Sequence, residues 1–467
     1  MSLTNTHHGA EAIGSMLKHC KTLLFIGVGG VSMCSLAELA LSEGFSVIGT
    51  DRVDGSRLER LRRLGADIRI GHSADHAVGA DAAIYTVAID GENPEYLAMK
   101  EAGKPLISRA DYLGYAMTRY RTRIGIAGMN GKSTTTAMCG HILRGAGNPT
   151  VFGGAEASTL GGASCLIGKQ REQMVFEACE YKDSFLDFSP NVAVILNVGL
   201  DHVDYFADLE QIIDSFHQYA DLVGENGTVI VNRDDENAMR AVQGCRGKLV
   251  TYGVDEMADF YAVNITEERG CRRFDLMHDC KKLCRIRLLQ PGKYQVENAL
   301  AASVCAYLCG VSPEVIEKQI ATFVGVRRRM EYRGTLNGAV VYDDYAHHPT
   351  AIQATLAGAR EMGYDRVLCV YQPHTYSRTA GLFEEFSQAF EDADRVFFAD
   401  IYAAREENVS GVTSAQLAEA VGEKASYAST FEELSVTLSD VARPGDLILV
   451  MGAGDIENLF SILPLKL

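Results

Sequence analysis

The sequence predicts an α/β protein of about three domains with mainly parallel sheets. The chain has 467 residues, and a domain takes roughly 150 residues. Short Val/Ile/Leu runs alternate with longer amphipathic stretches, which is typical of parallel strands joined by helices. Three of these runs lead into glycine turns, near residues 27, 128 and 452. The spacing of the turns indicates that each opens a separate unit.

Nine apolar runs are the expected strands. They are Leu23–Ile26, Ser46–Gly49, Ala83–Val87, Arg123–Ala127, Ala193–Asn197, Gly227–Val231, Arg366–Val370, Arg395–Ala399 and Asp446–Met451. The segment 249–290 differs, because it contains short strand-like runs separated by turns. We expect an antiparallel excursion there, with strands at Leu249–Tyr252, Phe260–Ile265, Arg273–Met277 and Leu283–Leu288.

Composition and charge narrow the class of protein. The net charge is -17, from 44 Lys and Arg against 61 Asp and Glu, with no basic run, so nucleic-acid binding is not expected. The 12 cysteines form no C-x-x-C pair, which favours buried thiols in a reducing compartment over zinc or disulfides. The first residues carry no apolar leader, and the nearly uncharged stretch 23–41 contains turn glycines and Glu38. We expect a cytoplasmic protein with no membrane contact.

The first glycine turn predicts a phosphate site. Gly27 and Gly29 match the start of G-x-G-x-x-G, but Ser32 stands at the third glycine position. The turn follows a strand and opens a helix, whose N-terminus favours a diphosphate. Asp51 ends the next expected strand, where a carboxylate meets a ribose or base hydroxyl. This turn alone would suggest a nicotinamide dehydrogenase, and a tight turn without a ligand is the structural alternative.

The second glycine turn is a short phosphate loop. Gly128-Met-Asn-Gly-Lys-Ser follows the strand Arg123–Ala127 and reads G-x-x-G-K-S. Backbone N–H groups and the helix dipole would hold the β- and γ-phosphates of a nucleotide. Lys132 would add a positive charge, and Ser133 a hydroxyl for Mg²⁺.

Polar residues at other strand ends could complete this site. Glu177 and Glu180 follow one apolar run, and Asp201 and His202 follow another, so these side chains are candidate metal ligands. Two dense polar strings lie downstream, at the strand ends where α/β sheets place ligand sites. They are Asp343-Asp-Tyr-Ala-His-His-Pro349 and Gln372-Pro-His-Thr-Tyr-Ser-Arg-Thr379.

These strings, taken in order, resemble the Mur ligases of peptidoglycan synthesis. The resemblance covers essentially the whole chain through ten segments. They are Gly27–Met33, Gly128–Thr136, Glu177–Phe185, Asn197–His202, Asn298–Ala302, Gly325–Glu331, Asp343–Pro349, Gln372–Thr379, Asp400–Glu406 and Gly452–Ile456. The last polar strings are similar to those of the branch whose acceptor is the carboxylate of UDP-N-acetylmuramate.

The resemblance implies three domains and an activity. Residues 1–121 would form a Rossmann-like domain for UDP. Residues 122–328 would form a P-loop-type ATPase domain with a mainly parallel sheet, and residues 329–467 a Rossmann-like domain for the amine. ATP would phosphorylate the lactyl carboxylate of UDP-N-acetylmuramate, and L-alanine would attack the acyl phosphate. Such chemistry needs positioning and charge neutralisation rather than a protein nucleophile.

The resemblance also assigns roles to particular residues. The implied catalytic residues are Lys132, His202, Arg329 and His348. ATP would be bound by Gly128, Asn130, Gly131, Lys132, Ser133, Thr134, Asn298, Arg329 and Asp344. UDP would be bound by Gly27, Gly29, Gly30 and Asp51, in place of a dinucleotide. Mg²⁺ would be held by Ser133, Glu177 and His202, and the amine and muramoyl side would be lined by Tyr345, His348, His374 and Arg378.

Several positions depart from the family pattern, and alternatives stay open. Met129 and Asn130 replace the usual Thr and His, and Gln295 replaces an asparagine. A recycling ligase that adds a preformed peptide to the same acceptor is the nearest rival. A nicotinamide-dependent oxidoreductase and a nucleotide-binding regulator without ligase activity are more distant. Glycine or serine could replace alanine, since one methyl group gives only about 1–3 kcal/mol of discrimination. The oligomeric state is not predicted.

Overall fold

The computed structural model describes residues 3–202, 205–255, 257–268, 271–404 and 406–466. It divides into two compact units, which are described separately. The first comprises residues 1–259 and 301–316, and the second comprises residues 260–300 and 317–467. Among the described residues, no helix has the length and apolar character needed to cross a membrane.

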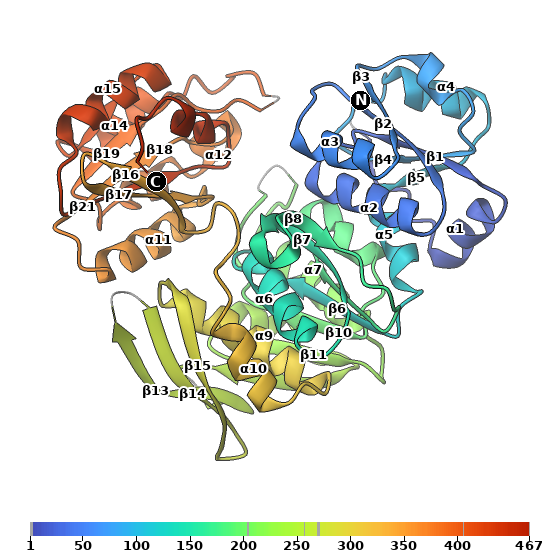
Figure 1. Ribbon diagram of the computed structural model, residues 1–467, viewed down its shortest axis with the longest axis horizontal. Helices are drawn as coiled ribbons and strands as arrows, with labels where there is room; N and C mark the ends of the chain where they lie inside the picture. Colours follow the sequence, from blue (N-terminus) through green and yellow to red (C-terminus); the bar gives the residue numbers. More distant parts are fainter. Residues whose placement is uncertain (1–2, 203–204, 256, 269–270, 405, 467) are drawn as a thin grey trace. The chain divides into compact units, whose positions relative to one another are not determined.

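The first sheet of unit 1 is fully parallel and has the order β3-β2-β1-β4-β5. Its strands are β1 (Thr22–Ile26), β2 (Ser46–Asp51), β3 (Asp67–Ile70), β4 (Ala82–Tyr85) and β5 (Leu106–Ser108). Its helices are α1 (Ala10–Leu17), α2 (Val31–Ser42), α3 (Ser56–Arg63), α4 (Pro94–Glu101) and α5 (Arg109–Met117). Strand β1 is central and buried, so the turn that follows it lies in the middle of the sheet's carboxyl edge (Figure 1).

The second sheet of unit 1 carries the phosphate loop. Its order within the unit is β12-β11-β10-β6-β9-β7-β8, and every pair is parallel except β7 with β8. The strands are β6 (Thr122–Ala127), β7 (Thr150–Ala157), β8 (Ala163–Leu166), β9 (Gln173–Glu177), β10 (Val192–Ile195), β11 (Thr228–Asn232) and β12 (Lys248–Gly253). The helices are α6 (Lys132–Arg144), α7 (Leu209–Asp221) and α8 (Glu236–Ala241). Strand β6 lies between β10 and β9, so the ends of all three meet at one edge.

The expected antiparallel excursion is confirmed for three of its four strands. In unit 2, β13 (Phe260–Glu268), β14 (Cys271–His278) and β15 (Lys281–Pro291) pair antiparallel. The strand predicted at Leu249–Tyr252 is present as β12, but it pairs parallel with β11, so the expected antiparallel direction is wrong for that pair. Helix α8 lies between β11 and β12 and carries the chain back across the sheet, which makes the next strand parallel.

The last sheet, in unit 2, has the order β16-β17-β21-β18-β19-β20. Its strands are β16 (Glu331–Leu336), β17 (Ala339–Asp344), β18 (Arg366–Tyr371), β19 (Arg395–Phe398), β20 (Ala425–Tyr427) and β21 (Asp446–Met451). Only β16 is antiparallel. The chain passes between the units ahead of β13 and again within α9 (Tyr294–Leu308) and α10 (Pro313–Ile320).

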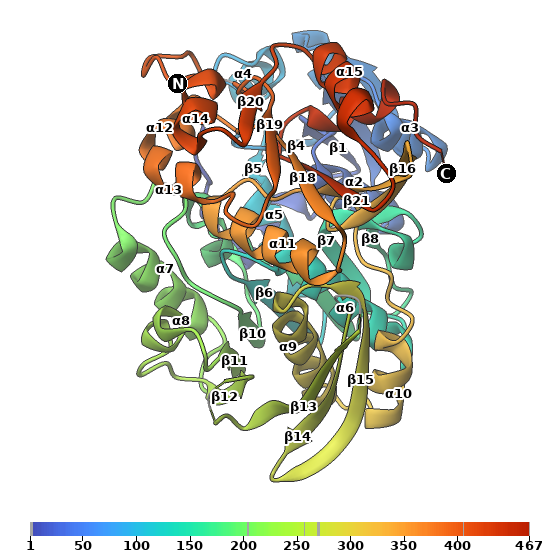
Figure 2. The same ribbon diagram turned by 90° about the vertical axis from the view of Figure 1, so that its left-hand side faces the viewer.

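Two apolar cores cover the two faces of this last sheet. One face packs against α11 (Pro349–Glu361), α13 (Phe383–Gln388) and α14 (Ser414–Val421). Helix α12 (Tyr376–Gly381) directly precedes α13. The other face packs against α15 (Phe431–Val441) and the short helix η4 (Ile456–Ser461), as Figure 2 shows for α14 and α15. The loops after β18 and β21 therefore leave the sheet toward opposite faces, which is where open α/β sheets bind ligands.

Candidate active site

The phosphate loop connects β6 to α6 and contains the predicted sequence. Gly128 has a φ of 148° and Gly131 a φ of 84°, which side chains rarely adopt. A Cβ at Gly128 would also lie 2.9 Å from Leu196 Cβ. Lys132 and Ser133 are the first two residues of α6, and Ser133 and Thr134 are buried. The sequence thus places backbone N–H groups and a lysine at one helix N-terminus.

Asn197, just beyond β10, holds this loop by its backbone. Its Oδ1 accepts from Asn130 N at 2.7 Å, and its Nδ2 donates to Asn130 O at 3.2 Å. Its carbonyl oxygen accepts from Met129 N at 3.1 Å. These contacts use only main-chain atoms of the loop, so they do not depend on the side chains at 129 and 130. The sequence predicted no role for Asn197, because the contact joins residues 67 apart.

Lys132 lies over the loop and is paired with a buried carboxylate. Its Nζ donates to Gly128 O at 2.5 Å, Met129 O at 3.2 Å and Glu180 Oε1 at 3.1 Å. His202 Nε2 lies 3.8 Å from the same Glu180 oxygen. The predicted pair Lys132 and His202 therefore shares one carboxylate.

Electrostatics keep the ammonium of Lys132 charged. Burial alone would lower the pKa of Lys132, but the charge of Glu180, followed by Cys179 and Glu177, raises it above its usual value. His202 has a φ of 53°, which is rare for a residue other than glycine and costs roughly 1–3 kcal/mol. Its backbone N donates to Asp201 Oδ1 at 2.7 Å, and its ring packs on Tyr181 at 4.7 Å between centroids.

Glu177 ends β9 beside β6 and is fixed by a neighbouring strand. Its Oε2 accepts from Gly154 N at 3.0 Å. A Cβ at Gly154 would overlap the carboxylate of Glu177, so a larger residue there would displace that side chain. In the part of the chain that the structure describes, no three His, Cys, Asp or Glu side chains converge on one metal position. The set Ser133, Glu177 and His202 stays a prediction.

The first glycine turn is held together by Asp51. Gly29 N donates to Asp51 Oδ2 at 2.8 Å, and Val53 N donates to Oδ1 at 3.3 Å. A Cβ at Gly29 would lie 2.8 Å from that carboxylate, and one at Gly27 would lie 2.7 Å from Thr86. Gly30 is the N-cap of α2. Gly27, Gly29, Gly30 and Asp51 thus lie together, and Asp51 already accepts two backbone hydrogen bonds.

In unit 2, an arginine pair stacks on Tyr345 at the start of the last domain. The guanidinium carbons of Arg328 and Arg329 lie 5.1 and 5.2 Å from the Tyr345 ring centroid. Asp344 ends β17, and its two oxygens accept from Met330 N and Ala346 N, both at 2.8 Å. Burial raises the pKa of Asp344 although Arg329 is near. The predicted residues Arg329, Asp344 and Tyr345 therefore lie together.

Asn298 lies one turn into α9, also in unit 2. It is buried, and its Nδ2 donates to Gln295 Oε1 at 3.3 Å. Gln295 is one of the departures from the family pattern. It lies three residues before Asn298 on the same helix face and is also buried. The amide pair is thus retained with one longer side chain.

A row of rings joins the two polar strings of unit 2. The ring centroids of Tyr345 and His347 are 5.5 Å apart, those of His347 and His374 are 6.1 Å apart, and those of His374 and Tyr402 are 5.6 Å apart. Arg378 Nη1 lies 3.3 Å from His374 Nδ1. Because arginine only donates, Nδ1 accepts and His374 carries its proton on Nε2. Sequence reasoning missed His347 and Tyr402, although both lie in the segments of the family resemblance.

His374 is neutral in this environment. Burial, assisted by the charge of Arg378, lowers the pKa of His374 to about 4. His348 lies elsewhere, as the N-cap of α11, with Nδ1 3.0 Å from Thr350 Oγ1. Of the residues predicted for the amine side, the row directly connects Tyr345, His374 and Arg378.

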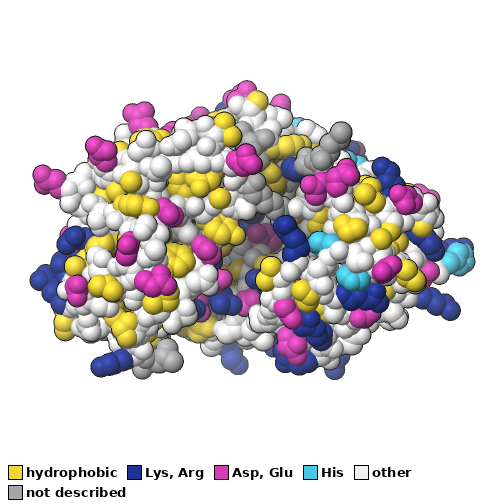
Figure 3. All heavy atoms as spheres, turned by 90° about the horizontal axis from the view of Figure 1, so that it is seen from above, with side chains coloured by type: hydrophobic (Ala, Val, Ile, Leu, Met, Phe, Trp, Pro, Cys, Tyr) yellow, Lys and Arg dark blue, Asp and Glu magenta, His cyan; other side chains and the backbone are white. Residues whose placement is uncertain are grey.

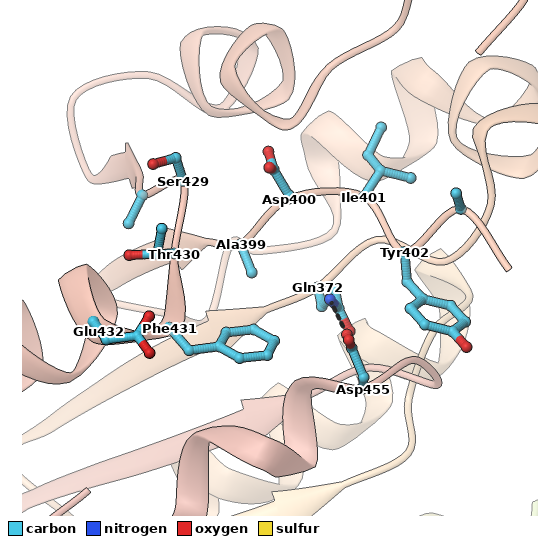
Figure 4. A pocket seen from close by; sticks show the side chains of 12 residues that line it. Gln372, Ala399, Asp400, Ile401, Tyr402, Ser429, Thr430, Phe431, Glu432 and Asp455 are labelled. Carbon is cyan, nitrogen blue, oxygen red and sulfur yellow. Dashed lines mark hydrogen bonds between the residues drawn. The ribbon is translucent and has the colours of Figure 1, made fainter. Parts of the chain in front are cut away.

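A surface cavity of about 360 Å³ borders this row. It lies at the carboxyl ends of β18, β19 and β20 and is lined by Tyr402, Asp400 and Phe431 among others. Gln372 Nε2 donates to Asp455 Oδ1 at 2.8 Å across its floor (Figure 4). The bond links the loops that follow β18 and β21.

The phosphate loop and the mainly parallel sheets define a P-loop class of α/β protein, and the chain belongs to the Mur ligase family. Three family models match in succession. The Mur ligase family, catalytic domain matches residues 22–121, the Mur ligase middle domain residues 126–306, and the Mur ligase, glutamate ligase domain residues 328–454. The predicted three-domain α/β class is therefore confirmed.

Individual members of the family are similar to the chain over nearly its whole length. The chain is 42% identical, over 95% of its length and 97% of the relative's, to a UDP-N-acetylmuramate--L-alanine ligase of Caldanaerobacter subterraneus subsp. tengcongensis. The crystal structure of a UDP-N-acetylmuramate-alanine ligase from Thermotoga maritima superposes with a TM-score of 0.79 at 26% identity, covering 95% and 98% of the two chains. A murein peptide ligase from Psychrobacter arcticus has a TM-score of 0.73 at 23% identity over the same shares, which shows a common fold only.

Proposed function

We propose that the protein is an ATP-dependent ligase that forms an amide between L-alanine and the lactyl carboxylate of UDP-N-acetylmuramate. The observation that carries the proposal is the phosphate loop, where Lys132 lies over a backbone fixed by Asn197. Near-full-length relatives carrying the name of this activity, at about 40% identity, support the choice of substrates. The use of ATP and a UDP-linked precursor supports a cytoplasmic location.

The reaction follows two steps that need no protein nucleophile. A lactyl carboxylate oxygen attacks the γ-phosphorus of ATP, and ADP leaves with the bridging oxygen. The alanine nitrogen then attacks the acyl carbon, loses a proton, and displaces inorganic phosphate. Lys132 supplies positive charge where negative charge builds up on the transferred phosphoryl group. The backbone N–H groups of the loop hold the phosphates in place.

The residues around Lys132 fit a divalent cation. Glu180 is 3% exposed, and its Oε2 is buried with no hydrogen-bond partner among the described residues. A buried carboxylate oxygen without a partner is costly, and a cation would satisfy it. Mg²⁺ is usually held by one or two carboxylates together with substrate phosphates, so a preformed cluster of three ligands is not required. Ser133, Glu177, His202 and Glu180 would hold it, and when bound it would neutralise phosphate charge.

The substrates are assigned to the ends of the three sheets. The glycine turn after β1 would bind UDP, with Gly27, Gly29 and Gly30 at the phosphates and Asp51 fixing the turn. Asn298, Arg329 and Asp344 would contact ATP. The proposed domain boundaries remain at 121/122 and 328/329.

The amine would bind beside the ring row of unit 2. Tyr345, His374 and Arg378 would line it together with His348. Because His374 is neutral and protonated on Nε2, it would donate a hydrogen bond to the amino-acid carboxylate rather than accept a proton from the amine.

Phosphate release tests the proposal directly. The full-length protein is supplied with ATP, Mg²⁺ and UDP-N-acetylmuramate, and with L-alanine, glycine, L-serine or a muropeptide tripeptide in parallel. Release that requires the UDP-sugar and is fastest with L-alanine supports the proposal. Preference for the tripeptide would assign the chain to peptide recycling, and no release with any amine would overturn the ligase assignment.

A further inference from the structure

Arg109 lies beside the first glycine turn, and nothing in the sequence singled it out. It directly follows β5 and is the first residue of α5. Its Nη1 donates to Ser32 Oγ at 3.1 Å. Ser32 is the second residue of α2, the helix that the glycine turn opens. The guanidinium therefore lies at the helix end where a phosphate would be bound.

This arginine lacks the carboxylate partner that neighbouring arginines have. Arg57 pairs with Glu156 at 3.3 Å, Arg60 with Glu38 at 2.7 Å, and Arg119 with Glu43 at 2.7 Å. In the described parts of the chain, no carboxylate forms an ion pair with Arg109.

The environment of Arg109 is unfavourable for an unpaired charge. Glu177 and Asp187 act on its guanidinium only at longer range, and burial lowers the pKa of Arg109. The side chain is half-buried. A desolvated cation with a single hydroxyl partner is costly unless an anion is supplied.

We propose that Arg109 binds the diphosphate of the UDP-linked substrate, opposite the backbone N–H groups of the glycine turn. The inference rests on the proposed function, since it names a further binding residue for the same substrate. A guanidinium presents a planar fork of N–H donors that suits two phosphate oxygens at once. Its contact with Ser32 directs that fork to the first turn of α2. The substrate's other anionic group, the lactyl carboxylate, is the competing assignment.

Binding measurements on the full chain separate these assignments. Isothermal titration gives the Kd of uridine, UDP, UDP-N-acetylglucosamine and UDP-N-acetylmuramate for the wild type, Arg109→Met and Arg109→Lys. Uridine has no phosphate, and UDP-N-acetylglucosamine has no lactyl group. Arg121→Met is the matched control, because Arg121 is exposed in the same unit and lies 3.8 Å from Glu172.

We expect Arg109→Met to weaken UDP and both UDP-sugars by the same factor, about tenfold to a hundredfold, and to leave uridine unchanged. Arg109→Lys should lose less, because it keeps the charge without the fork. Unchanged UDP affinity in both variants would overturn the inference, as would a loss confined to UDP-N-acetylmuramate. If the wild type binds no UDP-sugar, the proposed function itself fails. If Arg109→Met does not fold, the UDP affinity of Arg109→Lys tests the inference.

Discussion

Asn197 and Asn130 are joined by two reciprocal hydrogen bonds, from Asn130 N to the Asn197 side chain and from that side chain to Asn130 O. The side chain of Asn197 thus pairs with the main chain of the phosphate loop as a neighbouring strand would. Because only the main chain of Asn130 takes part, the loop keeps its shape with residues at 129 and 130 that differ from the family pattern. Those departures therefore do not argue against nucleotide binding.

Asn197→Ala should weaken ATP binding without affecting UDP-N-acetylmuramate. Loss of two hydrogen bonds leaves the backbone of Asn130 unpaired, which costs roughly 1–3 kcal/mol and corresponds to about a tenfold rise in KM for ATP. Asn197→Asp should be worse, since it places a negative charge beside the phosphates. Equal KM values for ATP in all three proteins would show that the loop does not depend on this contact.

Lys132→Ala should abolish ligation while the UDP-sugar still binds. Among the described residues, the ammonium donates hydrogen bonds to the phosphate loop and Glu180 alone, whereas the glycine turn after β1 is formed by other residues. We expect kcat to fall by at least about a hundredfold, as for other lost charge-stabilising groups. Calorimetry with UDP-N-acetylmuramate checks binding in the same preparation. Full turnover in this variant would contradict the active-site assignment.

Gly154→Ala should weaken the use of Mg²⁺ by displacing Glu177. The added methyl group overlaps the Glu177 carboxylate, so that side chain must leave its hydrogen bond to the backbone of residue 154. We expect the Mg²⁺ concentration for half-maximal activity to rise. Gly147→Ala is the control, because its Cβ would meet nothing closer than 3.8 Å. Identical Mg²⁺ titrations for the two variants would show that Glu177 does not hold the cation.

His374 should titrate near pH 4 instead of 6.5. Burial and the Arg378 charge both disfavour the imidazolium, so the neutral ring is favoured in the folded state and stability falls as the pH drops from about 6.5 toward 4. Histidine-labelled protein and NMR give the midpoint, with His374→Gln assigning the signal. Arg378→Met should raise the midpoint but leave it below 6.5, since burial remains. A midpoint at or above 6.5 in the wild type would show that burial and Arg378 do not lower the pKa of His374.

Local sequence patterns predicted the central strands and the glycine turns well. Strands such as β1, β6 and β18 are largely buried, and each leads into a turn that carries a glycine or polar string. The short or polar edge strands β3 (Asp67–Ile70) and β20 (Ala425–Tyr427) were not predicted, because edge strands need few apolar residues and pair with little else. The parallel pairing of β12 was also missed, since direction depends on the connection.

Candidate site residues could be predicted where they lie in one continuous sequence motif. Lys132, Glu177 and Arg329 lie in such motifs, and their roles stay predictions. Contacts between distant segments could not be predicted, which is why Asn197 and Arg109 emerged only from the structure. The net charge could be predicted from composition alone. Acidic side chains are scattered over the face shown in Figure 3, in keeping with the net charge of -17.

The fate of the lactyl oxygens tests the central claim most directly. UDP-N-acetylmuramate is labelled with ¹⁸O at both carboxylate oxygens and converted with ATP and L-alanine, and the phosphate and the amide product are analysed by mass spectrometry. An acyl phosphate route transfers one labelled oxygen to phosphate and leaves the other in the amide carbonyl. Phosphate without label would contradict the account, because the γ-phosphoryl group would then have gone to water.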